Sequence, residues 1–371
     1  MGMLARTGGS SVVAQEVGEG LAALGVPVRY CHLDAGGVRP GLDFHIDASP
    51  GNASSMLLDV PAALGGGLDA ATGLLGAFER WPFDLFHLHN LQVFGPPALM
   101  LKWMRSVPYV VTCHGSDVLS EVLMDRNRDV AEALLRQAAA VTCVSQHLAD
   151  ALQRKVPGLA HVSVIPNFVR AAWRQPRALR RPEPARFLHV SSMRPVKRPE
   201  LLLEAFRRVR AARPDAVLVI ATTAMGRERL RTIVGDKSRE QGLHVMDCAA
   251  DPEVLSREYR RACALVLTSR FEGFGLVVLE ALAHGIPVVA PAVGALPEVL
   301  GHDWPLLVED CGEEDADADA VAAAALRAAD GHGAAPERIA AVLARYDGPA
   351  QIAAYARLYQ HVLTGRPEEV R

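Results

Sequence analysis

Short apolar runs alternate with amphipathic segments along most of this chain. The apolar runs are bounded by turn residues, and the segments between them carry apolar positions at helical spacing. This alternation is typical of parallel sheets whose strands are connected by helices. In the first half, the predicted strands are 26–32, 85–88, 109–112, 140–144 and 162–165, and the predicted helices include 12–24, 97–104 and 129–137.

A second round of the same alternation follows a proline- and arginine-rich stretch, residues 166–184, which we interpret as a linker. The predicted strands of the second half are 187–191, 216–221, 243–246, 264–268 and 287–290. The restart predicts an α/β fold of two Rossmann-like, doubly wound domains that face a cleft. The domains are expected at 1–168 and 184–348. A final helix at 351–363 follows a Gly–Pro break, and residues 349–371 are expected to pack back onto the first domain.

Composition narrows the function classes. The chain has 371 residues, too many for one ordinary core, and 39 basic against 42 acidic residues, so its net charge of -3 provides no field for nucleic acid. No apolar run is long enough to span a membrane, and the 6 cysteines form no CxxC pair. We therefore expect a cytoplasmic protein with reduced thiols. The oligomeric state is left open, with a homodimer as one alternative.

An acidic run at 313–330 contains Asp315, Asp317 and Asp319 at alternate positions. A calcium loop would need glycine at Ala320 and a bidentate glutamate at Leu326, so that match fails. Acidic residues at the start of a helix are favoured by the helix dipole. We expect no metal here and no cofactor.

Two motifs could bind a phosphate group. Residues 7–11, Thr-Gly-Gly-Ser-Ser, precede a helical run, where free backbone N–H groups attract anions, although a plain strand-to-helix turn explains them equally well. Residues 192–198 follow the first strand of the second half and include Arg194 and Lys197, which could neutralise a diphosphate. The alternative is a solvated basic turn.

The strongest motif is Arg270 to Ala281. Gly273 and Gly275 open a predicted helix whose first N–H groups are free. Glu280 stands alone in the apolar run 276–283, where an unpaired carboxylate is costly. Glu272 lies eight residues earlier, up to ~12 Å away along a helix. One carboxylate could hold sugar hydroxyls and the other a ribose. The alternative is one acid at the start of a helix and one salt-bridged acid.

Polar residues also follow two strands of the first half, at 87–90 (His-Leu-His-Asn) and 113–117 (Cys-His-Gly-Ser-Asp). Single histidines are commonly hydrogen-bonded core residues. His114 is a better candidate for ligand contact because Gly115 suits close backbone approach. His87 and His89 would face the same side of a strand, but no third metal ligand is evident.

Together these motifs resemble the retaining glycosyltransferases of family 4, which have the GT-B fold. The likeness rests on the two glutamates at 272 and 280, on 284–289 and 294–299 after them, and on 8–13, 114–117, 165–168 and 194–198. It covers nearly the whole chain. Within the family, the motifs are most similar to the branch that makes the low-molecular-weight thiols bacillithiol and mycothiol.

The resemblance implies roles for individual residues. Four would be catalytic: His114, Arg194, Lys197 and Glu272. The donor would be bound by Gly9, Ser10, Arg194, Lys197, Glu272, Gly273, Phe274, Gly275, Leu276 and Glu280. The acceptor side would include Ser11, Asn90 and His114. Arg194 and Lys197 would bind phosphates, and Glu280 the ribose.

Departures from the family pattern lie mostly on the acceptor side. Ser11 replaces a usual glycine, Asn90 stands where a tyrosine is common, and residues 222–226 replace a GDG-type turn. The first strand is shorter than the family's, as at a truncated start. The favoured donor is a UDP-sugar, with UDP-GlcNAc as one example, and the favoured acceptor is a small polar molecule. The alternatives are a GDP-sugar donor, a thiol acceptor, a GT-B epimerase or phosphorylase, and a non-catalytic nucleotide-binding module.

Overall fold

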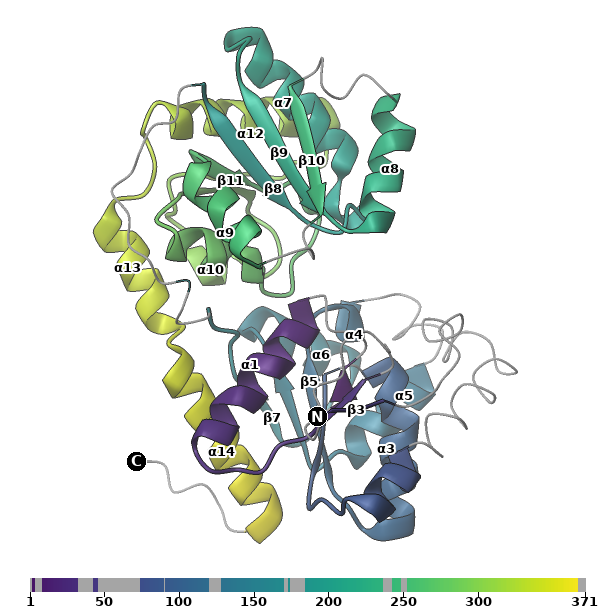
Figure 1. Cartoon of the computed structure of the whole chain (residues 1–371). Coiled ribbons are helices and arrows are strands. Elements are labelled where there is room, and N and C mark those ends of the chain that lie inside the picture. Colours follow the sequence, from purple (N-terminus) through teal and green to yellow (C-terminus); the bar gives the residue numbers. More distant parts are fainter. Residues whose placement is uncertain are drawn as a thin grey trace. The chain divides into compact units, whose positions relative to one another are not determined.

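The structure, a computed structural model, describes residues 2–3, 9–32, 43–45, 74–89, 91–119, 128–169, 173, 184–235, 242–247 and 252–365. The chain forms two compact units, one of Met1–Asn167 with Gly348–Arg371, and one of Phe168–Asp347. Each unit holds a parallel sheet covered by helices (Figure 1). The predicted α/β fold with two parallel sheets is confirmed.

The first unit has a seven-stranded sheet in the order β3-β2-β1-β4-β5-β6-β7, and its pairings are parallel. Its strands are β1 (Gly2–Met3), β2 (Tyr30–His32), β3 (Asp43–His45), β4 (Phe86–Leu88), β5 (Tyr109–Cys113), β6 (Ala140–Cys143) and β7 (Val162–Val164). The prediction for β2 began too early, because Pro27 has no N–H to donate to a strand ladder. The sequence pattern did not indicate β3.

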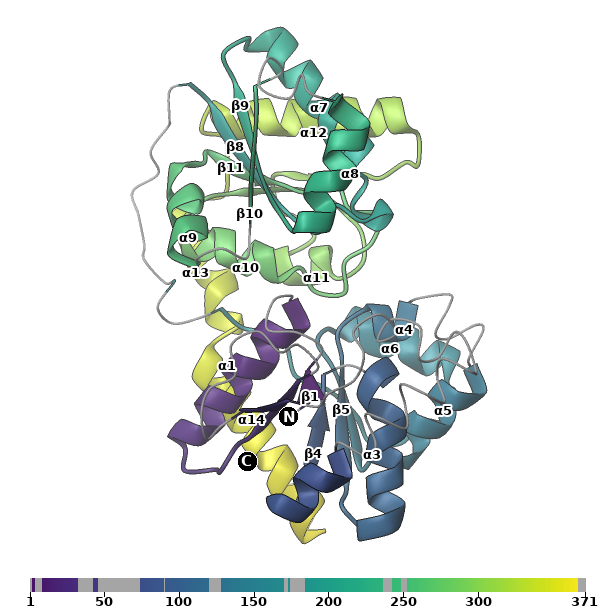
Figure 2. The same cartoon turned by 45° about the vertical axis from the view of Figure 1, so that its right-hand side comes forward.

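Helices surround this sheet: α1 (Gly9–Ala23), α3 (Leu91–Arg105), α4 (Ser116–Leu119), α5 (Arg128–Gln137), α6 (Gln146–Lys155) and α14 (Gly348–Thr364). Helix α3 begins six residues before the predicted start at Pro97, because burial of Leu91 and Phe94 stabilises its first turns despite two internal prolines. Helix α14 lies beside α1 (Figures 1 and 2), and a Cβ at Gly20 would be 2.2 Å from Ile352 Cδ1. The last helix therefore packs closely against the first unit.

The second unit has a six-stranded parallel sheet in the order β10-β9-β8-β11-β12-β13. Its strands are β8 (Arg186–Val190), β9 (Val217–Thr222), β10 (Leu243–Asp247), β11 (Ala264–Val266), β12 (Val288–Pro291) and β13 (Leu307–Val308). Its helices are α7 (Pro199–Ala212), α8 (Ala224–Val234), α9 (Pro252–Arg261), α10 (Leu276–Ala283), α11 (Leu296–Leu300), α12 (Glu314–Ala329) and α13 (Pro336–Arg345). Helices α7 and α12 pack together on one face of the sheet, and α9 and α10 lie on the other (Figure 2).

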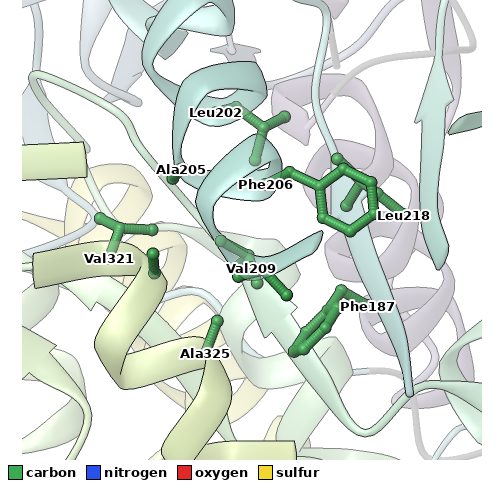
Figure 3. A pocket seen from close by; sticks show the side chains of 10 residues that line it. Phe187, Leu202, Ala205, Phe206, Val209, Leu218, Val321 and Ala325 are labelled. Atoms are coloured by element: carbon green, nitrogen blue, oxygen red, sulfur yellow. The ribbon is translucent and has the colours of Figure 1, made fainter. Parts of the chain in front are cut away.

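A small apolar cavity lies between α7, α12 and the sheet of the second unit. Figure 3 shows Phe187, Phe206 and Leu218 pointing into this space, with Val321 and Ala325 facing them from α12. The side chains around the cavity carry only carbon atoms, so it belongs to the hydrophobic core and offers no polar group to a ligand.

Among the described residues, no helix combines the length and the apolar character that crossing a membrane requires. The described cysteines Cys113, Cys143, Cys263 and Cys311 are free thiols.

Candidate functional site

The order of strands reverses once in each sheet, between β1 and β4 in the first unit and between β8 and β11 in the second. In open α/β sheets, ligands bind beyond the carboxyl ends of the strands at such a switch point. Residues 192–198 follow β8, and residues 269–275 follow β11. Two of the sequence motifs therefore lie at the switch point of the second unit.

Lys197 and Glu272 join these two motifs directly. The Lys197 Nζ is 2.6 Å from Glu272 Oε1, and Ser269 Oγ donates to the same oxygen at 2.6 Å. The side chains of Lys197 and Glu272 are only 18% and 10% exposed, so the ion pair is largely shielded from water. A mobile ammonium group at this position can also neutralise an anion that binds beside it.

The turn that carries Lys197 has an unusual backbone. Met193 and Arg198 have φ values of 53° and 50°, in the left-handed region that residues with side chains seldom adopt. Such strain persists where surrounding contacts hold it. Thr268 Oγ1 donates to the Lys197 carbonyl at 2.8 Å, which ties the turn to the loop after β11.

Arg198 anchors the same turn from inside the unit. Its guanidinium is buried and donates to Asp310 at 2.8 Å and also to Asp317. Arg194, by contrast, is exposed, and its Nε donates to Ser192 Oγ at 3.3 Å. Of the cations in this motif, Arg198 is buried in ion pairs, Lys197 pairs with Glu272, and Arg194 is exposed.

The aspartates of the acidic run 313–330 are paired with arginines. Asp317 pairs with the buried Arg198, and Asp315 and Asp319 both contact Arg208 at 2.7 Å. The run opens helix α12, as the dipole argument predicts. Within the described part of the chain, no cluster of three or more histidine, cysteine, aspartate or glutamate side chains could hold a metal. Independence from a metal stays a prediction.

Helix α10 begins directly after Gly275, whose φ of 83° only glycine adopts without strain. The first N–H groups of this helix have no partner within the helix and can bind an anion. The Phe274 ring is buried against Tyr346, with ring centroids 5.3 Å apart. Any contact of Phe274 with a ligand must therefore come from its backbone. Gly273 and Leu276, which flank this start, are half-buried.

Glu280 lies one turn from the end of α10 and is half-buried. Tyr259 OH donates to Glu280 Oε2 at 2.8 Å, and His284 Nδ1 donates to the Glu280 carbonyl at 2.7 Å. Tyr259 and His284 stack at 5.0 Å, which fixes both rings. The lone glutamate of the apolar run thus has a buried tyrosine partner that the sequence motif did not indicate. The only feature of the sequence that pointed to Tyr259 as a buried residue was its spacing from Leu255, which places both on one helix face.

Three histidines gather at the carboxyl ends of β4 and β5 in the first unit. The ring centroids of His87 and His89 are 4.2 Å apart, and those of His89 and His114 are 5.2 Å apart. His89 Nδ1 and His114 Nε2 are 3.0 Å apart and share a hydrogen bond. Burial lowers the pKa of His114 to about 4, and it also lowers the pKa values of His87 and His89 well below their ordinary range. The cluster is therefore neutral at pH 7.

Asp117 fixes the backbone around His114. Its Oδ2 accepts a hydrogen bond from the His114 N–H at 3.0 Å, and its Oδ1 accepts one from the Leu91 N–H at 3.4 Å. Gly115 has a φ of 138°, a value that disfavours a side chain at this turn. Burial raises the pKa of Asp117, although the backbone N–H groups around it oppose that shift.

The remaining predicted residues lie at the start of α1. Gly9, Ser10 and Ser11 form its first turn, and Ser11 is buried. Gly9 has open space around it. Thr7, Gly8 and Asn90 lie outside the described residues.

The family model described as "Glycosyl transferases group 1" matches residues 172–327, and the model "Glycosyl transferase 4-like domain" matches residues 8–167. Together they account for most of both units. The matched ranges include the candidate site residues of both units.

Curated relatives include glycogen synthase of Mycobacterium tuberculosis, 31% identical over 61% of this chain and 56% of that protein. This chain therefore spans little more than half the length of that relative. N-acetyl-alpha-D-glucosaminyl L-malate synthase of Bacillus anthracis is 24% identical over 80% of this chain and 78% of its own length. D-inositol 3-phosphate glycosyltransferase of Pseudarthrobacter chlorophenolicus is 27% identical, covering 80% of this chain and 76% of that protein.

Solved structures agree on the fold. Sucrose-phosphate synthase from Thermosynechococcus elongatus superimposes with a TM-score of 0.74 at 20% identity and covers 97% of this chain and 95% of that one. Anabaena HepE in complex with UDP gives a TM-score of 0.71 at 18% identity, over 97% of this chain and 98% of that one. The predicted GT-B fold is confirmed.

Proposed function

This chain belongs to the glycosyl transferases group 1, and on that premise we propose that it moves a sugar from a nucleoside diphosphate donor to a small polar acceptor with retention of anomeric configuration. The observation that carries this proposal is the Lys197–Glu272 ion pair at the switch point of the second unit. The pair links the basic turn after β8 to the loop that leads into α10, and a cation together with the first N–H groups of a helix suits a diphosphate.

The donor is held by the second unit in this proposal. Lys197 and the exposed Arg194 neutralise the diphosphate, and the first N–H groups of α10 bind its oxygens. Glu272 then exchanges its contact with Lys197 for the hydroxyls of the sugar. Glu280, oriented by Tyr259, accepts hydrogen bonds from the ribose diol.

The reaction needs no protein nucleophile. The bond between the anomeric carbon and the phosphate oxygen breaks, and the acceptor oxygen forms the new glycosidic bond on the same face. The departing phosphate oxygen takes the acceptor's proton. The enzyme's main contribution is then the stabilisation of negative charge on the leaving group, for which preorganised donors supply several kcal/mol.

We favour UDP as the nucleotide. Anabaena HepE was solved with UDP, and the pneumococcal transferase GtfA, with a TM-score of 0.61, was solved with UDP and GlcNAc. Two relatives are named for the small polar acceptors L-malate and D-inositol 3-phosphate. The acceptor is proposed to be of this class, within thiol or secondary-metabolite synthesis. A GDP-sugar donor and a thiol acceptor remain alternatives within the same chemistry.

The test has two stages. Thermal shifts with UDP, GDP and ADP identify the nucleotide, since a ligand that binds the folded state raises the midpoint of unfolding. Nucleotide sugars are then mixed with malate, inositol phosphate or small thiols, and products are identified by mass. Product formed without an acceptor indicates an epimerase, and dependence on inorganic phosphate indicates a phosphorylase. No shift with any nucleotide contradicts the proposal.

A further inference from the structure

The contact between His89 and His114 restricts where the protons of both rings lie. Each neutral imidazole carries one N–H and one bare nitrogen. A hydrogen bond between His89 Nδ1 and His114 Nε2, 3.0 Å apart, needs a proton on one of these two atoms only. Two arrangements are therefore open, and they give His114 opposite properties at its other nitrogen.

The surroundings of His89 separate the two arrangements. The His89 ring is buried, and its Nε2 has no hydrogen-bond partner among the described residues. If His114 donated, the His89 proton would be on this Nε2, as a buried N–H group without an acceptor. If His89 donates, its Nε2 is a bare acceptor. Buried N–H groups without partners are the rarer of the two in proteins, so donation by His89 is favoured.

The neighbouring His87 cannot be the hydrogen-bond partner of His89 Nε2, because both nitrogens of His87 already have partners. His87 Nδ1 is 2.5 Å from Tyr359 OH, and His87 Nε2 is 2.7 Å from Thr112 Oγ1. Its ring packs against that of His89 at an interplanar angle of 41° and contacts Tyr355, which lies on α14 as Tyr359 does. These contacts fix the plane of the ring against which His89 packs.

We propose that His89 is a positioning residue that donates through Nδ1 to His114 Nε2, so that His114 presents an N–H at Nδ1 to the substrate. His114 is half-buried, and its Nδ1 has no hydrogen-bond partner within the described ranges. With this proton arrangement, His114 is a neutral hydrogen-bond donor to a sugar or acceptor oxygen. It does not act as a general base, because its bare nitrogen is taken by His89. This inference rests on the proposed function for the identity of the ligand.

The arrangement of protons can be measured without any substrate. In protein labelled with ¹⁵N-histidine, long-range ¹H–¹⁵N correlations distinguish Nδ1–H from Nε2–H rings. Two other histidines provide internal references, since His189 Nδ1 donates to the Val266 carbonyl and His284 Nδ1 donates to the Glu280 carbonyl. The signals are assigned by their loss in single asparagine variants. We expect His89 and His114 to share the Nδ1–H pattern of the references. A His114 signal with the Nε2–H pattern overturns the proposal.

Two variants test the consequence for turnover. Asparagine can place an amide N–H near the position of a histidine Nδ1, whereas leucine cannot donate. We expect His89→Leu to reduce kcat about tenfold with little change in the KM of the donor, and His89→Asn to recover most of that loss. Equal loss in both variants, with unchanged unfolding midpoints, contradicts a role through donation. If the wild-type protein transfers no sugar at all, the proposed function fails, while the NMR result still decides the proton arrangement.

Discussion

A Cβ atom built on Gly294 would lie 2.2 Å from the carbonyl oxygen of Glu272. The two residues come from different loops, and the Ala295 N–H also donates to that same carbonyl at 2.9 Å. Gly294 has a φ of 58°, so both its conformation and its contact require a residue without a side chain. The position of the glutamate therefore depends on a glycine that lies outside the motif containing it.

Gly294→Ala is expected to shift the Glu272 loop and to weaken both nucleotide affinity and turnover, each by at least about tenfold. Gly312→Ala is the matched control, because Gly312 also has a positive φ, 80°, but has no atom near its Cβ position. The control suffers only the backbone cost, of order 1 kcal/mol. Titration with UDP and steady-state rates check this. Equal effects of the two substitutions would show that the contact with Glu272 is unimportant.

Lys197→Ala is expected to reduce turnover about 10²-fold or more while the chain stays folded, because a preorganised charge beside the leaving group is lost. Arg207→Ala removes an exposed cation of α7 that pairs with Glu204, and it serves as a control for net charge. Rates with a saturating donor, together with unfolding midpoints, are the measurement. A near-normal rate in Lys197→Ala would refute its action on the leaving group.

Glu280→Ala is expected chiefly to weaken nucleotide affinity, because its proposed ligand is the ribose. Tyr259→Phe leaves the carboxylate in place but removes a hydrogen bond of 2.8 Å, and it should weaken affinity by a smaller factor, about tenfold. Tyr109→Phe is the control, since its hydroxyl donates to the Leu134 carbonyl in the other unit. Isothermal titration with UDP measures the dissociation constants of the three variants. An unchanged dissociation constant in Glu280→Ala would exclude the ribose assignment.

The buried histidines of the first unit predict lower stability in acid. His114 stays neutral in the folded state down to a pKa of about 4, whereas in the unfolded chain it protonates near 6.5. The unfolded state therefore binds more protons between these values, and the free energy of unfolding falls as the pH drops from about 6.5 towards 4.

Urea unfolding at pH 7, 6 and 5 measures this dependence in wild type and in His114→Asn. The variant should take up about one proton fewer on unfolding. His332→Asn, at an exposed histidine, should behave like the wild type. The same pH dependence in His114→Asn and wild type would mean that His114 is not held neutral by the fold.

Local patterns in the sequence are enough to predict the alternation of strands and helices, the two sheets and the positions of the motifs. These features follow from local periodicity and from the cost of burying polar groups, both of which are written along the chain. Helix α10 coincides with the apolar run 276–283 that follows the two glycines, because glycine and an apolar run define it locally.

The contacts between distant side chains become visible only in the folded chain. Lys197 and Glu272 are 75 positions apart, and Arg198 and Asp317 are 119 apart. Arg198 belongs to the same basic motif as Arg194 and Lys197, yet its backbone is left-handed and its side chain pairs with Asp310 and with the buried Asp317. Likewise, the sequence placed His87 and His89 on one side of a strand, but the bond of His89 to His114 appears only when β4 and β5 are neighbours in the sheet. Contacts of this kind depend on strand order and on loop conformation, which no local pattern encodes.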